Sequence, residues 1–425
     1  MKNTVGGAGL HADPDKLLDA LTIALMRQPN LTREAMGGLS LLRRRRAERA
    51  NPGLISTHDR TLEGQLAALA AMQEGVGVVA AADAAALAQS VLGPPDAGAL
   101  EACLRAKLPN GAGGQVLNIK TIEGGYSKQT SFFEWRRADG MHEDYVLRRD
   151  AKSDVIGTTV CDEYPLVAAL HRAGYKVAEA VLLVTGDPGI PEPFMIVRRM
   201  GGKTIGGPLG AGPDRSANPS LVLAEALAQL HAISPAELGV PRFSDQPFDK
   251  AALLSDIGYW RDRYHVNREA ASPTLDLAFD FLVSEADAGL QPGVVVHGDC
   301  DFYNLLTEDG RFVALLDWEM AHLGSPVWDL SYVKESVESF GPYGAFLDAY
   351  VQHGGLRPSA AALAYYNVFR LVRGGVMCVT GVGMFNRGQP IALDLVDVNC
   401  TLYARFLLQL PDAIAAFRSA KGAQT

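Results

Sequence analysis

Four polar residues in the second half of the chain have the types and spacing to carry out chemistry together. The stretch VVVHGDCDFYNLLTEDGRFVALLDWE, residues 294–319, places His297, Asp299, Asn304 and Asp317 in otherwise apolar sequence. Carboxylate and amide oxygens are the protein ligands that Mg²⁺ prefers, with water and substrate phosphates completing its coordination. Gathered in one place, these side chains would form a site for such a hard cation.

Two short strands are expected to position these side chains. Apolar runs precede His297 and Asp317, and both runs are typical of short buried strands. Asp299 and Asn304 then lie on the loop after the first strand. If the two strands pair as a hairpin, all three oxygen-bearing side chains lie at the same end of the pair.

The composition is that of a globular protein with more than one domain. The chain has 425 residues, is 48% hydrophobic and 20% charged, and carries a net charge of -9. That charge argues against sequence-independent binding of nucleic acid. Because the N-terminus lacks an apolar core flanked by positive charge, we expect a cytoplasmic protein with no membrane association. The sequence leaves open whether the chain forms a homodimer.

The periodicity of apolar residues changes twice along the chain. Residues 13–107 have helical spacing and end at a Gly-rich linker, LPNGAGGQ, at 108–115. Short β-branched and aromatic runs follow, interrupted by one helical stretch at 160–173, and from about residue 219 the pattern is helical again, broken by two short strands. The pattern predicts a helical N-terminal module (1–110), a sheet-rich part (115–200) and a mainly helical part (201–425). The arginine run at 43–46 could bind phosphate or a partner, although a solvated helix surface is the simpler interpretation.

The motifs around the four polar residues resemble those of a known family, the protein-kinase-like small-molecule phosphotransferases. This family includes aminoglycoside and macrolide phosphotransferases and choline kinases. HGDCDFYN is similar to the HGDxxxxN motif of the family, a counterpart of the protein-kinase HRDxxxxN, and LDWE takes the place of DFG. The chain is most similar to the kinase-like domain associated with acyl-CoA dehydrogenases, over roughly residues 115–410. The resemblance implies an α+β, bilobal kinase-like fold, with an antiparallel sheet in the N-lobe and a mainly helical C-lobe, preceded by a small all-α module.

The resemblance also implies roles for the polar residues. Asp299 would accept or orient the proton of a substrate hydroxyl, and His297 would brace the loop. Asn304 and Asp317 would hold Mg²⁺ against the phosphates of ATP. Asp329, in VWDLSY, would support the catalytic loop from the next helix. The implied partner is a small hydroxylated molecule, with ATP and Mg²⁺ as cofactors.

A second group of residues is implied to bind the nucleotide. Most lie on the predicted strands of the N-lobe. Arg148 occupies the position where the family often has lysine, and Glu163 on the following helix would pair with it. The full set comprises the glycine-containing loop, this ion pair and the hinge between the lobes: Gly124, Gly125, Ser127, Arg148, Glu163, Val197 and Arg199.

The sequence leaves open two alternatives to a kinase of hydroxyacyl compounds: an aminoglycoside-type antibiotic kinase and a non-catalytic scaffold. Gly298 replaces the arginine of HRD, and only about eight residues separate Asp317 from the next helix, which favours a small-molecule enzyme over a protein kinase. The acceptor could be a hydroxyacyl compound or an aminoglycoside-type antibiotic. A nucleotide-binding scaffold without catalytic activity is the alternative from another class. His231, in AQLHAI, is interpreted as a packing residue between helices.

Overall fold

The computed structural model divides the chain into two compact units, Met1–Ser90 with Ile391–Thr401, and Val91–Pro390 with Leu402–Thr425. The residues that the structure describes are 93–122, 127–150, 156–205, 210–211, 218–268, 270–387, 389, 391 and 393–423. The helices predicted before residue 93 and the arginine run at 43–46 lie outside these residues. The fold below is that of the second unit, which includes the last helix, α15 (Leu393–Gly422), from Leu402 onward.

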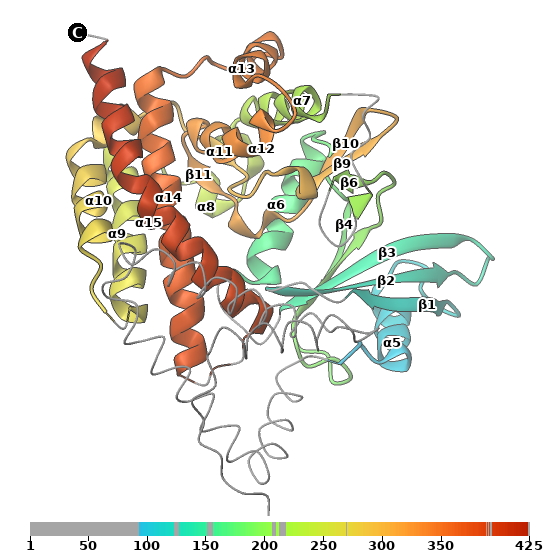
Figure 1. Ribbon diagram of the computed structural model, residues 1–425. Coiled ribbons are helices and arrows are strands. Elements are labelled where there is room, and N and C mark those ends of the chain that lie inside the picture. The colour runs from blue at the N-terminus through green and yellow to red at the C-terminus, as the bar shows by residue number, and fades with distance from the viewer. Residues whose placement is uncertain are drawn as a thin grey trace, which may run out of the picture. The chain divides into compact units, whose positions relative to one another are not determined.

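An antiparallel sheet of five strands forms the first half of this unit (Figure 1). The strand order is β1-β2-β3-β5-β4, with the following bounds: β1 Gln115–Ile122, β2 Lys128–Arg136, β3 His142–Asp150, β4 Ala180–Val184 and β5 Phe194–Arg198. Buried positions alternate along the end of β2 and along β3, as expected for strands with one face on a core. The sheet predicted between residues 115 and 200 is therefore present.

Helix α5 (Ala97–Lys107) packs on one face of this sheet. Asp96 caps its N-terminus by accepting the N–H of Ala99 at 2.7 Å. Leu100 and Leu104 are fully buried in the same core as Trp135 of β2. We predicted that this helix belongs to the N-terminal module, and that prediction is wrong because its apolar face is buried against the sheet.

Helix α6 (Val160–Arg172) is the single helix between the sheet strands. A capping box starts it, since the side chain of Thr159 accepts from the N–H of Asp162 and Asp162 accepts from the N–H of Thr159. Leu166 and Leu170 are fully buried. The cap directs Glu163, in the first turn, towards the interior, where it is 1% exposed.

The second half of the unit is mainly helical. Its longer helices are α7 Pro219–His231, α9 Lys250–Asn267, α10 Pro273–Ser284, α13 Tyr343–Gln352, α14 Ala360–Asn386 and α15 Leu393–Gly422. Short helices α8 (Pro241–Ser244), α11 (Val327–Tyr332) and α12 (Lys334–Glu338) connect them. By length and composition α14 could span a membrane, but 67% of its apolar window is buried inside the protein, as in the core helix of a soluble domain.

Short strands surround the polar residues of the VVVHGD and LLDWE segments. Strand β8 (Val294–Val296) pairs with β11 (His322–Gly324), and β9 (Leu305–Glu308) pairs with β10 (Arg311–Leu315). The predicted hairpin between the runs before His297 and Asp317 is therefore wrong. The loop after His297 and the segment before Asp317 are joined instead by a hydrogen bond outside any strand pair. Leu316 donates its N–H to the carbonyl of Asn304 at 2.8 Å. A two-stranded parallel pair, β6 (Thr204–Ile205) and β7 (Gly210–Ala211), completes the strands.

Candidate active site

The loop after β8 turns sharply at Gly298. Its φ is +83°, and a Cβ at this position would lie 2.4 Å from the backbone oxygen of Met320. Only glycine fits there. The residue that replaces the arginine of HRD is thus required by the backbone of this loop, and Asp299 follows it directly.

Asp329 holds the same loop from α11. This carboxylate is fully buried and accepts the N–H groups of His297 at 2.8 Å and of Gly298 at 2.9 Å. His231 lies 3.1 Å from it through Nε2 and contacts the hydroxyl of Tyr350 at 2.8 Å through Nδ1. The predicted supporting role of Asp329 is confirmed, and His231, which we interpreted as a packing residue, is part of this support.

His297 is fully buried and braces the segment before Asp317. Its Nε2 lies 2.9 Å from the carbonyl oxygen of Leu316, and its ring lies 4.6 Å from that of Trp318, centroid to centroid. Nδ1 accepts the N–H of Asp299 at 3.3 Å. With one nitrogen bonded to each segment, this residue joins the two motifs and orients Asp299.

Asp299 is held by two tyrosines and an asparagine. The hydroxyls of Tyr303 and Tyr332 both donate to its Oδ1 at 2.5 Å. Asn304 donates from Nδ2 to the carbonyl oxygen of Asp299 at 2.8 Å and to its Oδ2 at 3.1 Å. Burial raises the pKa of Asp299, and the tyrosine hydrogen bonds oppose this rise. The result is an oriented carboxylate that can accept a proton.

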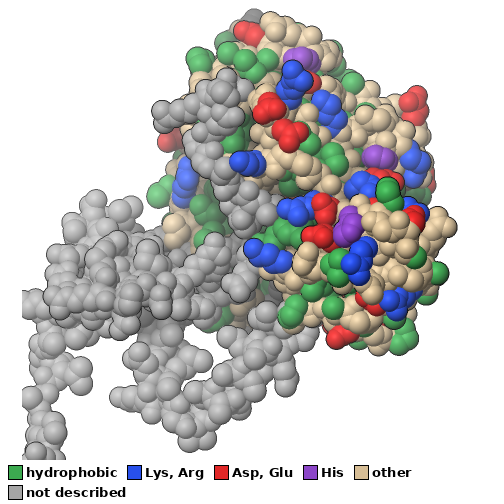
Figure 2. All heavy atoms as spheres, turned by 90° about the vertical axis from the view of Figure 1, so that its right-hand side faces the viewer, with side chains coloured by type: hydrophobic (Ala, Val, Ile, Leu, Met, Phe, Trp, Pro, Cys, Tyr) green, Lys and Arg blue, Asp and Glu red, His purple; other side chains and the backbone are tan. Residues whose placement is uncertain are grey.

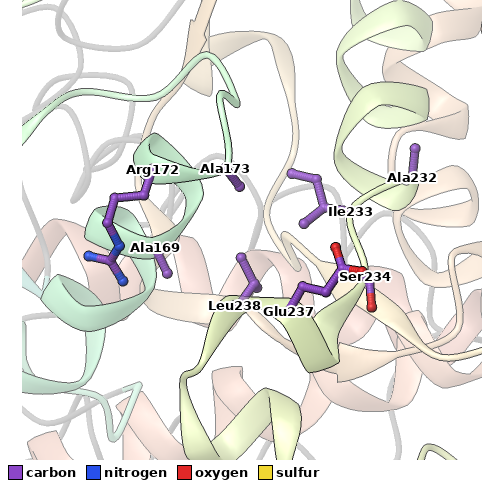
Figure 3. Close-up of a pocket in the computed structure, with 8 residues that line it drawn as sticks. All are labelled: Ala169, Arg172, Ala173, Ala232, Ile233, Ser234, Glu237 and Leu238. Carbon is purple, nitrogen blue, oxygen red and sulfur yellow. The ribbon is translucent and has the colours of Figure 1, made fainter.

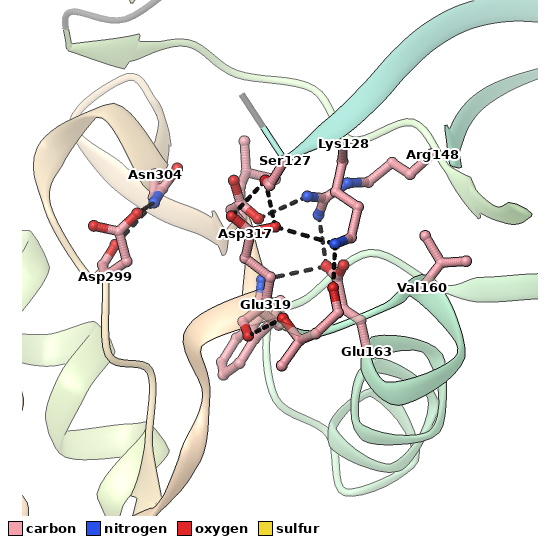
Figure 4. A network of polar contacts seen from close by, with 12 residues as sticks. Ser127, Lys128, Arg148, Val160, Glu163, Asp299, Asn304, Asp317 and Glu319 are labelled. Atoms are coloured by element: carbon pink, nitrogen blue, oxygen red, sulfur yellow. Dashed lines mark hydrogen bonds and ion pairs between the residues drawn. The ribbon is translucent and has the colours of Figure 1, made fainter. Parts of the chain in front are cut away.

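Arg148 joins the sheet, α6 and the LLDWE segment (Figure 4). Its NH1 lies 2.5 Å from Glu163 and its NH2 lies 2.6 Å from Asp317. The Arg148–Glu163 ion pair predicted from the sequence is therefore present. Burial opposes the charge of Asp317, but the guanidinium outweighs it and lowers the pKa of this carboxyl. Asp317 stands in the left-handed region with φ 65°, an unusual backbone conformation that often occurs at functional sites.

Ser127 and Lys128, at the start of β2, contact the residue two positions after Asp317. The Ser127 hydroxyl lies 2.7 and 2.6 Å from the two carboxylate oxygens of Glu319. Lys128 is 4% exposed and lies 3.5 Å from Glu319 and 3.3 Å from Asp150. Burial raises the pKa of Glu319 to about 8. The base of the glycine-containing loop is thereby attached to the segment that carries Asp317.

The donor set fits the Mg²⁺ that the motifs imply. Asn304 uses its Nδ2 on Asp299, and among the described residues no group donates to its Oδ1. Burial opposes the charge of Asp317, but Arg148 lowers the pKa of this carboxyl overall and so favours its charged form, and the side chain is 34% exposed. The described residues contain no cluster of three or more His, Cys, Asp or Glu suited to a metal. Mg²⁺ does not need one, because it binds through one or two protein oxygens plus phosphates and water.

The hinge residues lie apart from this network. The N–H of Arg199 donates to the carbonyl of Asp144 at 2.9 Å, and its guanidinium lies 4.7 Å from the ring of Phe132. Val197 is buried and pairs with strands on both sides. The N–H of Arg199 is thus used within the sheet, and the contact of this hinge with adenine stays a prediction. Gly124 and Gly125 lie outside the described residues.

Sequence reasoning missed four contributors to the site: Lys128, Tyr303, Glu319 and Tyr332. Two of them had a visible signal. Tyr303 lies inside the HGDCDFYN motif, and Glu319 is the last residue of LDWE, where an acid replaces the glycine of DFG. Lys128 and Tyr332 gave none, since their roles depend on contacts with residues far along the chain.

A pocket of about 550 Å³ lies elsewhere, where α6 and α7 end (Figure 3). Its lining residues are Ala169, Arg172, Ala173, Ala232, Ile233, Ser234, Glu237 and Leu238. None of the candidate site residues lines it, and it contains one cation and one carboxylate. Its volume alone therefore does not indicate a catalytic centre.

The surface that carries β1–β3 has mixed charge. Figure 2 shows acidic and basic side chains interspersed over the described part of this face. Several form ion pairs on the exposed hairpins, such as Arg137 with Asp139 at 2.9 Å. No continuous basic area is visible on the described part of this face.

Two solved structures with the same architecture are named as antibiotic phosphotransferases. A protein from Ralstonia eutropha JMP134, assigned to the aminoglycoside phosphotransferases, aligns with a TM-score of 0.57 and 19% identity, covering 77% of this chain and 98% of that one. Macrolide 2'-phosphotransferase MphH from Brachybacterium faecium aligns with a TM-score of 0.51 and 21% identity, covering 73% and 97%. The fold is thus the kinase-like phosphotransferase fold, and the predicted fold class is confirmed.

The sequence belongs to a corresponding family. A profile of the phosphotransferase enzyme family (APH) matches residues 118–366, more than half of the chain, and this protein is a member of that family. Acyl-CoA dehydrogenase family member 11 of Rattus norvegicus is 24% identical over 247 residues, which are 56% of this chain and 31% of the relative. The Gallus gallus protein of the same name is 26% identical over 52% of this chain and 28% of its own length. The chain therefore matches about a third of these relatives.

Proposed function

We propose that this protein is an ATP- and Mg²⁺-dependent phosphotransferase that phosphorylates a hydroxyl group of a small molecule. The observation that carries the proposal is the Asp299 carboxylate, held by Tyr303, Tyr332 and Asn304 beside the Arg148–Asp317 pair. Phosphoryl transfer requires positioning and charge neutralisation more than covalent chemistry. These residues supply both, within a family whose members are phosphotransferases.

Each residue has a role that follows from its contacts. Asp299 orients the acceptor hydroxyl and accepts its proton, while His297 and Asp329 keep the loop in place. Arg148, held by Glu163, faces the phosphates. Asn304 and Asp317 would hold Mg²⁺, which neutralises charge on the phosphates when bound.

The nucleotide and the acceptor class are inferred from relatives. The structure of APH(4)-Ia, similar to this chain with a TM-score of 0.50 and 16% identity, was solved as a ternary complex with AMP-PNP and hygromycin B. This supports ATP as the donor. The match to acyl-CoA dehydrogenase family member 11 supports a hydroxyacyl compound as the acceptor.

The test is Mg²⁺-dependent ATP consumption against a panel of hydroxy acids, hydroxyacyl-CoA thioesters, choline and aminoglycosides. Asp299→Asn should lower kcat by about 10²- to 10⁴-fold while ATP still binds. Asp317→Asn should abolish the dependence on Mg²⁺ together with activity. The matched control is Asp309→Asn. Asp309 is an exposed acid in the β9–β10 turn with positive φ, a conformation that asparagine also adopts, so this variant should keep full activity.

A non-catalytic scaffold is the opposing outcome of this test. It would bind nucleotide, and no compound in the panel would stimulate ATP consumption. An Asp299→Asn protein with unchanged phosphotransfer would equally contradict the proposal.

A further inference from the structure

Arg373 of α14 is a buried cation with no carboxylate partner. It is 6% exposed, and its guanidinium lies between the rings of Trp260 from α9 and Trp328 from α11, at 4.9 and 4.7 Å from their centroids. Within the described part of the chain, no acid lies within ion-pair distance of it, and its N–H groups donate no hydrogen bond. The side-chain nitrogens of Arg373 are not fully buried, unlike the unpartnered Nε atom of Arg148. The guanidinium is therefore open on one side.

A cation in this position is costly for the fold. Burial lowers the pKa of Arg373, and Asp256, the largest opposing charge, does not reach it as an ion pair. Buried charges are normally paired with a counter-charge. The two indole rings attract the guanidinium through their faces, which holds it in place without neutralising it. The arrangement therefore leaves a fixed positive charge that has no counter-charge and is open on one side, where an anion can pair with it.

The guanidinium lies beside the catalytic loop. Trp328, which it contacts, and Tyr332 are four residues apart on α11 and so lie on the same side of that helix, with Cβ atoms about 5–6 Å apart. Tyr332 in turn donates to Asp299. The carboxylate of Asp299 lies close enough to Arg373 for its charge to act on the guanidinium. A small molecule with its hydroxyl at Asp299 could therefore reach the guanidinium with another group about one helical turn away.

We propose that Arg373 binds an acidic group, a carboxylate or a phosphate, of the hydroxylated acceptor. This inference rests on the proposed phosphotransferase function and specifies its substrate class. An arginine fork pairs with two oxygens of either anion at once. Trp260 and Trp328 fix the orientation of that fork, so little conformational freedom is lost when the anion binds.

The same geometry disfavours cationic acceptors. Tryptophan faces are the groups that recognise ammonium ions such as choline. Here Arg373 already lies over one face of each of the two tryptophans, Trp260 and Trp328. A polycationic aminoglycoside would also place like charges next to the guanidinium, which costs affinity. Of the acceptor classes that the sequence left open, the acidic hydroxyacyl class fits this subsite.

The experiment measures KM for matched acidic and neutral acceptors in the wild type and in Arg373→Met and Arg373→Lys proteins. The pairs are a hydroxy acid with its methyl ester, and a hydroxyacyl-CoA with the corresponding hydroxyacyl-pantetheine. Arg373→Met should raise KM for the acidic member about 10- to 100-fold and leave KM for the neutral member and for ATP unchanged. In Arg373→Lys, the KM for the acidic member should lie between the values of the wild type and of Arg373→Met. The pair that responds identifies the anion as carboxylate or phosphate.

Arg261→Met is the matched control, because Arg261 also lies over an aromatic ring, that of Phe279 at 5.3 Å, but pairs with Asp280. It should leave every KM unchanged. If the Arg373 variants do not fold, a measurement on the wild type tests the same subsite. It uses an analogue of the acceptor that lacks the hydroxyl. The free acid of this analogue should inhibit competitively, and its amide should not.

The failures are distinguishable. If acidic and neutral acceptors have equal KM values that do not change in Arg373→Met, or if an aminoglycoside is the preferred acceptor, the subsite is overturned while the phosphotransferase function stands. If the wild type phosphorylates no acceptor, the proposed function is overturned and this inference with it.

Discussion

The hydroxyl of Ser127 lies within hydrogen-bond distance of both carboxylate oxygens of Glu319, although 192 positions separate the two residues. Ser127 starts the strand after the glycine-containing loop, and Glu319 ends the LLDWE segment. This contact therefore links the loop that would cover the phosphates to the segment that carries Asp317, the acid that would hold the metal. Lys128 adds a positive charge at 3.5 Å from the same carboxylate.

Glu319→Gln should change how stability depends on pH. Burial raises the pKa of Glu319 from 4.5 to about 8. In that interval the folded protein binds more protons than the unfolded chain, so this residue makes the free energy of unfolding fall as pH rises from about 4.5 to about 8. Glutamine lacks this titration while keeping an acceptor for Ser127.

The measurement is thermal unfolding between pH 5 and pH 8, without nucleotide or metal. The variant should gain stability relative to the wild type as pH rises. Glu308→Gln, an exposed glutamate on β9, should follow the wild type. A constant difference between Glu319→Gln and the wild type across this range would show that Glu319 does not titrate there.

Arg148→Lys should weaken nucleotide use without unfolding the protein. A single ammonium cannot reproduce the two contacts of the guanidinium, with Glu163 at 2.5 Å and Asp317 at 2.6 Å. We expect kcat/KM for ATP to fall about 10- to 100-fold, because this is the effect of losing one charge-assisted hydrogen bond. Steady-state kinetics of Arg149→Lys provide the control, since Arg149 bonds Gln129 at 2.6 Å and contacts none of these acids. An equal loss in both variants would contradict a specific role for Arg148.

Arg148→Met should be much less stable than Arg148→Lys. The methionine would leave the buried carboxylate of Glu163 without a cation, and its Oε2 already has no hydrogen-bond partner. Removing one member of a buried pair typically costs about 3–5 kcal/mol. Urea unfolding of the two variants gives the comparison, and similar midpoints would indicate that the pair adds little to stability.

Tyr332→Phe should shift the acid limb of the pH–rate profile to higher pH. The tyrosine hydroxyl at 2.5 Å stabilises the charged form of Asp299 and so opposes the rise of its pKa caused by burial. Without that hydrogen bond, Asp299 takes up its proton at higher pH, and only the ionised form can accept the proton of the acceptor. Tyr343→Phe is the control, because Tyr343 donates to the carbonyl of Leu330. If the acid limb does not shift in Tyr332→Phe, the titration of Asp299 does not cause this limb.

Asp329→Ala should destabilise the protein by about 3–5 kcal/mol in urea unfolding. It would leave the buried N–H groups of His297 and Gly298 without an acceptor, and His231 without its partner. Asp280→Ala removes an exposed partner of Arg261 and should cost less than about 1 kcal/mol. Equal effects of the two substitutions would mean that the loop does not depend on Asp329.

The sequence by itself determined the residue types that meet at the candidate site and the order of the lobes. Asp299 and Asn304 lie five positions apart in one loop, so their contact depends on local geometry that a motif can encode. The Arg148–Glu163 pair was also predicted, because the resemblance to the kinase-like family implies an acidic partner for Arg148 on the helix that follows its strand. The periods of apolar residues separated the sheet from the helices, since each period reflects the buried face of one element.

The tertiary structure decided how several segments far apart in the chain pack together. It paired β8 with β11 instead of β10, placed α5 on the sheet, and brought Ser127 to Glu319. It also set Arg373 between two tryptophans. Apolar periodicity shows that a face is buried but not which partner buries it. That choice depends on how all the faces pack together, and no local stretch of sequence contains it.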